Sequence, residues 1–86
     1  MRDAHDRYAN IEARADAAMT GVQQIRSQQQ AQGLDIRGDI LAAMNRLHNH
    51  LDEANRAIAA RDIQAANEYM DRAENEAATL EKFLGR

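Results

Sequence analysis

The segment RLHNHLDEAN, residues 46–55, brings together the side chains of this chain that are best suited to chemistry. Two imidazoles, His48 and His50, and two carboxylates, Asp52 and Glu53, fall within one short stretch. Imidazole and carboxylate groups bind zinc, and they are also the commonest general acids and bases of enzymes. Whether these four groups can act together depends on the secondary structure that carries them.

A helix through this segment separates the two histidines. His48 and His50 then lie about 200° apart and flank the seam formed by Leu47 and Leu51 on opposite sides. His48 and Asp52 share one face as an i,i+4 pair and form a weak candidate metal site, but a zinc site needs a third ligand. The helical metal motifs Glu-x-x-His and H-E-x-x-H are both missing. We therefore expect no cofactor and interpret the two histidines as polar rims of a helix interface.

The remaining motifs do not predict catalysis either. The sequence contains no glycine-rich phosphate loop and no G-x-S-x-G nucleophile motif. Carboxylates are frequent between residues 68 and 81, but they lie off the apolar positions, where water screens them. We expect a solvated charged face with i,i+4 pairs such as Glu68 with Arg72 and Asp52 with Arg56. The prediction is a protein that is not an enzyme.

The composition predicts one small all-α domain. The chain has 86 residues, no proline and no cysteine, with alanine as its commonest residue. The net charge is −3 and the basic residues are scattered among the carboxylates, so no basic stripe is available for nucleic acid. Apolar runs are too short for membrane insertion. We expect a soluble chain, cytoplasmic by default, although a periplasmic or secreted parent chain stays open. The preference for arginine over lysine suggests a bacterial source.

Small and apolar residues recur at intervals of three and four in three separate segments, as in the heptads of coiled coils. The first stripe contains Tyr8, Ile11, Ala15, Ala18, Val22 and Ile25. The second stripe contains Ile40, Met44, Leu47, Leu51, Ala54 and Ile58. The third stripe contains Ala66, Met70, Ala73, Ala77, Leu80 and Leu84. The spacing predicts helices over about residues 3–32, 36–61 and 63–84 of a single domain.

Two reversals of the chain are predicted between these helices. Gly33 can adopt the left-handed conformation that ends a helix, and Asp35 or Asp39 can cap the next one. The second and third stripes are out of phase, and Asp62 is a candidate N-cap, which predicts a tight turn at Arg61 and Asp62. One continuous helix through this point is the alternative, and it would make the protein an extended dimeric coiled-coil spacer.

With both reversals, the stripes mirror one another in an antiparallel, up-down-up three-helix bundle. Large residues then face alanines in most layers, which fills space without voids. The two middle layers each place one leucine, Leu47 or Leu51, between two alanines. We therefore expect either a close approach of the helices there or apolar surface borrowed from a partner.

These features predict a helical protein–protein interaction or assembly module, such as the helical end domain of a larger bacterial protein. The expected partner is another protein or a second copy of the chain, and the interface candidates are Leu34, Leu41, Phe83, His48 and His50. Leu34, Leu41 and Phe83 map to the Gly33 end, where they either close the bundle or form a binding patch. A ligand- or metal-binding bundle is a further alternative. The segment RDIQAANEYMDRA resembles the second half of a tetratricopeptide repeat, which also implies protein binding.

Overall fold

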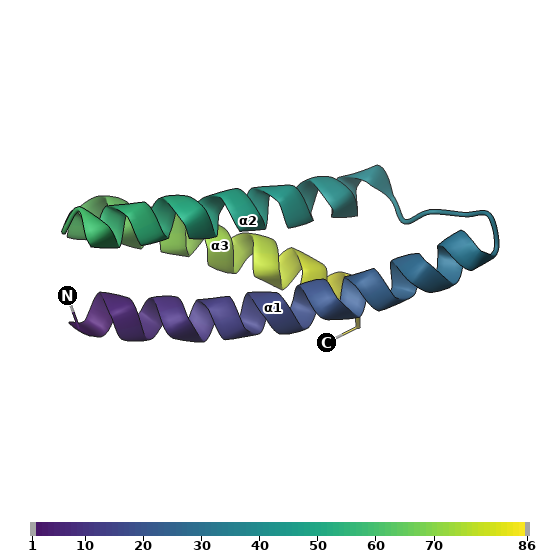
Figure 1. The fold of residues 1–86 in the computed structure, drawn as a ribbon, viewed down its shortest axis with the longest axis horizontal. Coiled ribbons are helices and arrows are strands. Elements are labelled where there is room, and N and C mark those ends of the chain that lie inside the picture. The colour runs from purple at the N-terminus through teal and green to yellow at the C-terminus, as the bar shows by residue number, and fades with distance from the viewer. Residues whose placement is uncertain (1, 86) are drawn as a thin grey trace.

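The computed structural model describes residues 2–85 and consists of three helices joined by two short connections (Figure 1). Helix α1 spans Arg2–Ala31, α2 spans Gly38–Ala59 and α3 spans Ile63–Phe83. The helix α2 runs antiparallel to α1 and α3, and the molecule measures 46 × 19 × 16 Å. The predicted all-α, up-down-up three-helix bundle is confirmed.

Gly33 ends α1 in the way that its position predicts. Its φ angle is +79°, in the left-handed region that a glycine adopts without a steric penalty. The Leu34 amide donates to the Gln29 carbonyl at 2.8 Å, and the Gly33 amide donates to the Gln30 carbonyl at 3.0 Å. These two bonds form a Schellman motif, which satisfies carbonyl groups that the end of a helix leaves open.

The predicted cap of α2 is wrong. The N-cap residue is Arg37, whose side chain makes no capping bond, and α2 begins at Gly38 rather than near residue 36. Asp35 is unavailable because its carboxylate accepts from the Ile36 amide at 2.8 Å and from the Arg26 guanidinium at 3.0 Å. Asp39 already lies inside the first turn of α2. The connection is therefore held by an ion pair to α1 rather than by a cap on α2.

The second reversal occurs where the change of phase predicts it. Arg61 has a φ angle of +59°, and the Asp62 amide donates to the Ala57 carbonyl at 2.9 Å. The Asp62 carboxylate caps α3 by accepting from the Ala65 amide at 3.1 Å. The continuous helix considered as an alternative is wrong, because α2 and α3 fold back side by side (Figure 1).

The core follows the three predicted stripes. Leu47 and Leu51 in the two middle layers are 0% and 6% exposed, so the chain itself covers both leucines without surface from a partner. Alanines that the stripes omit are buried as well, together with Ile36 of the first connection. The stripe residues that remain only partly buried are Tyr8, Ile25, Met44 and Leu84.

Helix α1 is displaced along α3 relative to the predicted layers. Arg7 binds Glu74, and Arg14 binds Glu81. In the mirrored stripes, Arg14 lies beside Arg72. Its observed partner, Glu81, is nine residues further along α3, which is about 13 Å at the α-helical rise. Long side chains account for only part of that distance. The last turns of α1 extend past the end of α3 (Figure 1).

Candidate interaction surface

The two histidines are separated, as the helix geometry predicts. His48 is exposed, and its Nε2 atom lies 3.5 Å from Oδ2 of Asp52. His50 is half-buried on the opposite flank of α2, where its ring centroid lies 6.4 Å from that of Tyr69 on α3. Within residues 2–85, no group of three or more potential metal ligands gathers. The candidate pair His48 and Asp52 thus has no third ligand beside it.

The neighbouring charged groups pair differently from the prediction. Arg56 donates to Glu53 at 3.1 Å, one turn back, rather than to Asp52. The Arg72 guanidinium lies over the Tyr69 ring, 5.2 Å from its centroid, a cation–π contact. Among the carboxylates expected on a solvated face, Glu68 and Asp71 are exposed, whereas Glu74, Glu76 and Glu81 are half-buried. The expected solvated face is therefore present only in part.

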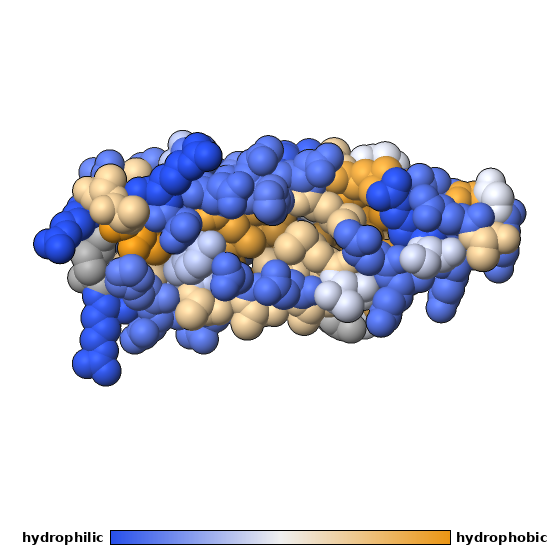
Figure 2. Space-filling model, viewed as in Figure 1, coloured by the Kyte–Doolittle hydropathy of each residue, from blue (hydrophilic) through white to orange (hydrophobic). Residues whose placement is uncertain are grey.

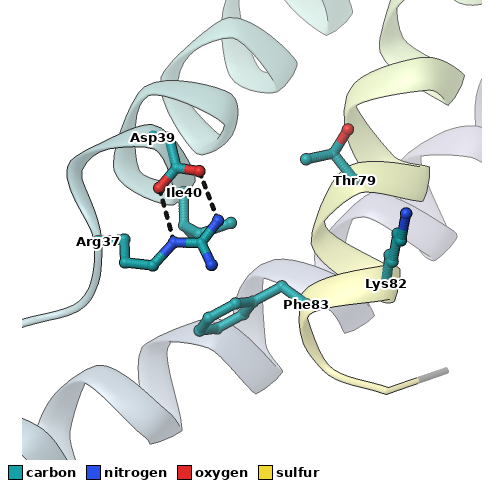
Figure 3. A pocket seen from close by; sticks show the side chains of 6 residues that line it. All are labelled: Arg37, Asp39, Ile40, Thr79, Lys82 and Phe83. Atoms are coloured by element: carbon teal, nitrogen blue, oxygen red, sulfur yellow. Dashed lines mark hydrogen bonds and ion pairs between the residues drawn. The ribbon is translucent and has the colours of Figure 1, made fainter.

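The three interface candidates near Gly33 do not form one patch. Leu34 is 59% exposed at the tip of the first connection, whereas Leu41 and Phe83 are half-buried against the core. Phe83 lines an open hollow of about 440 Å³ between the ends of α2 and α3 (Figure 3). Arg37, which donates to Asp39 at 2.6 and 3.0 Å, forms part of its rim. Leu41 does not line this hollow and lies about 100° further around α2 than Ile40.

Ion pairs bridge the groove between α1 and α3. Arg14 makes two bonds to Glu81, at 2.5 and 2.8 Å, and is 39% exposed. Arg7 donates to Asp71 at 2.6 Å and through Nε to Glu74 at 3.1 Å. The two arginines are seven residues apart, as are Glu74 and Glu81. Because both spacings are seven residues, the same type of ion pair forms twice between the parallel helices α1 and α3, two helical turns apart.

The groove between α2 and α3 is bridged in a similar way. Arg46 of α2 donates to Glu76 of α3 at 2.9 and 3.2 Å. The contact between His50 and Tyr69 lies on the same side of the helix pair. Helices α2 and α3 also pack most extensively of the three pairs, while α1 and α2 pack least.

The groove between α1 and α2 is different. Among residues 2–85, no arginine or lysine of one of these helices pairs with a carboxylate of the other. Tyr8 lies in this groove, and its hydroxyl donates to Glu12 at 3.1 Å. Burial, then the bond to Glu12, and then the charges of Asp52 and Asp16 raise the pKa of Tyr8 to about 12. Glu12 therefore contacts the phenol, and the charges of Asp16 on α1 and Asp52 on α2 also act on it.

Half-buried apolar side chains line this third groove. Tyr8 and Met19 lie on the flank of α1 opposite Arg7 and Arg14, and Met44 and Leu41 lie on the flank of α2 opposite Arg46. Figure 2 shows apolar atoms between the hydrophilic rows of α1 and α2, along much of this face. We call this surface the α1–α2 seam. Its apolar members are Tyr8, Met19, Leu41 and Met44, and its acidic rim is Glu12, Asp16 and Asp52.

Sequence reasoning missed the ion pairs between α1 and α3, and it missed the seam. A signal for the ion pairs was present, because Arg7 and Arg14 repeat at the same interval as Glu74 and Glu81. These carboxylates were instead assigned to a solvated face. The acidic rim gave no such signal, because Asp52 joins Glu12 and Asp16 only through the packing of α1 on α2.

Comparisons with protein-family models, with curated proteins and with solved structures give no match for this chain. No helix within residues 2–85 is long and apolar enough to cross a membrane. The fold defines the class, a small all-α three-helix bundle.

Proposed function

We propose that this chain is a non-enzymatic helical interaction or assembly module. The observation that carries the proposal is the α1–α2 seam, an apolar row that no ion pair of residues 2–85 crosses, whereas such pairs bridge both other grooves. Apolar surface between helices is where a further helix gains most from burial. A module of this kind binds another protein or a second copy of itself.

The arrangement of the titratable groups supports a binding role over catalysis. The His48 side chain is 69% exposed and that of Asp52 is 53% exposed. Catalytic acids and bases typically act from clefts, where burial brings their pKa values toward the working pH. An exposed pair on a helix surface instead serves as a polar rim around an interface.

Affinity capture with the purified chain as bait, combined with light scattering, tests this function. Met44→Glu places a charge in the seam, Phe83→Asp places one in the hollow of Figure 3, and Asn75→Glu adds the same charge on the exposed face of α3. We expect the wild type and Asn75→Glu to bind a protein, or to self-associate, and one of the other two variants to lose it. A chain that stays monomeric and captures the same proteins in all four forms contradicts the proposal.

A further inference from the structure

We propose that the α1–α2 seam binds a basic amphipathic helix of a partner protein and so completes a four-helix bundle. This inference rests on the proposed function and specifies the chemistry of the partner. It follows from the size of the seam, its position between two helices and the charge of its rim.

The size of the seam fits a helix of a few turns. Tyr8 and Met19 are eleven residues apart on α1, which corresponds to about 16 Å along the helix. Leu41 and Met44 lie on the facing flank of α2, toward the end of the bundle that holds Gly33. A helix of about 11 to 14 residues covers this length.

The position of the seam favours a helix over an extended segment. Two antiparallel helices leave a straight furrow, and a third rod packs into such a furrow by inserting its side chains between theirs. Small residues on α1 behind the seam, Ala15 and Ala18, are fully buried, so the half-buried residues at its edges are the apolar groups left to contact a partner. The partner therefore needs an apolar stripe at intervals of three and four.

The charge of the rim decides between a foreign helix and a second copy. The exposed carboxylates of Glu12 and Asp16 lie on the Tyr8 flank of α1, and that of Asp52 lies beside His48 on the Met44 flank of α2. Arg7 and Arg14, on the opposite flank of α1, are engaged by carboxylates of α3. Two seams placed face to face would oppose acid to acid, which disfavours self-association through this surface. Lysines or arginines on both sides of an apolar stripe complement the rim.

The test uses a fluorescein-labelled 18-residue synthetic helix with leucines on one stripe and lysines on both flanks. The control peptide is identical except that glutamate replaces each lysine. Fluorescence anisotropy with the whole chain should show saturable one-to-one binding of the lysine peptide. The glutamate peptide should bind at least ten-fold more weakly, and added salt should weaken binding of the lysine peptide.

Matched variants locate the binding. Asp16→Lys reverses a charge on the rim, and Glu68→Lys makes the same change on the exposed face of α3. We expect Asp16→Lys to raise Kd about ten-fold and Glu68→Lys to change it less than two-fold. Met44→Ala, a neutral truncation in the seam, should raise Kd several-fold while the far-UV circular dichroism spectrum stays helical.

Four outcomes overturn the inference. These are absence of binding, equal affinity for the two peptides, equal effects of the two charge reversals, and a dimer that Met44→Glu dissociates. A different result separates this inference from the proposed function. If only Phe83→Asp abolishes binding of a captured partner, the chain is an interaction module but the seam is not its docking surface.

Discussion

Leu47→Ala tests the central layer of the bundle most directly. Leu47 is fully buried, and alanines make up much of the buried core around it, with Ala18 and Ala77 both at most 1% exposed. Alanine side chains have no rotamers with which to fill a void, so we expect the cavity left by the substitution to persist. The free-energy cost should therefore contain both the transfer term and the full cavity term.

The expected loss is about 3 to 5 kcal/mol, the upper part of the range for buried leucines. A domain of this length has a free energy of unfolding of about 4 to 13 kcal/mol at 0.05 to 0.15 kcal/mol per residue. The variant thus loses about a quarter or more of its stability, and the midpoint of thermal unfolding should fall by at least about 12 °C. Leu34→Ala removes the same atoms from a side chain that is 59% exposed and should cost less than about 0.5 kcal/mol.

Urea unfolding followed by circular dichroism at 222 nm measures both variants. We expect the midpoint of Leu47→Ala to drop while the slope m stays that of the wild type. A loss below about 1 kcal/mol for Leu47→Ala, or equal losses for the two variants, would refute the reasoning. Such a result would mean that the helices move together and fill the cavity at position 47, or that Leu47 is not enclosed by side chains in the wild type.

Three further predictions concern the two connections. Asp62→Ala removes the cap of α3 and should cost about 1 kcal/mol in urea unfolding, whereas no loss would show that the turn alone starts the helix. Gly33→Ala meets no neighbouring atoms but forces a side chain to a φ of +79°, so it should cost about 1 kcal/mol, and a stabilised variant would contradict this. The bond from Arg26, and then that from the Ile36 amide, lower the pKa of Asp35, so its contribution to stability is present above its unfolded pKa and is lost as pH falls through its lower folded pKa. Carbon NMR titration of the Asp35 carboxyl should show this pKa rising in Arg26→Gln, and an unchanged value would remove the ion pair as its cause.

The sequence was sufficient for the features that local signals determine. The heptad spacing predicted three helices, the glycine at position 33 predicted the first reversal, and the change of phase at Asp62 predicted the second. Most of the stripe residues are buried because a helix of this spacing has only one face to bury. Helix boundaries also lie close to those expected, with α2 as the clearest difference.

Features that depend on how the helices slide past one another were not predictable in this way. Asp35 binds Arg26 instead of capping α2 because the first connection brings the end of α1 beside it. Leu34, Leu41 and Phe83 share one end of the molecule in the sequence pattern, but three different surfaces hold them. A pattern of apolar positions carries no information on which flank of a helix faces which neighbour.

The position of α1 shows why weak ion pairs can decide which flank of a helix faces which neighbour. Its stripe is rich in alanine, and small side chains offer shallow ridges that fit almost equally well at several registers. Partly exposed ion pairs contribute only about 0.2 to 1 kcal/mol each, but a difference of that size selects among registers of nearly equal energy. The pairs of Arg7 with Asp71 and of Arg14 with Glu81 favour the observed register of α1 along α3, in which the contact of α1 with α2 is the least extensive of the three. The seam and these ion pairs lie on opposite flanks of α1.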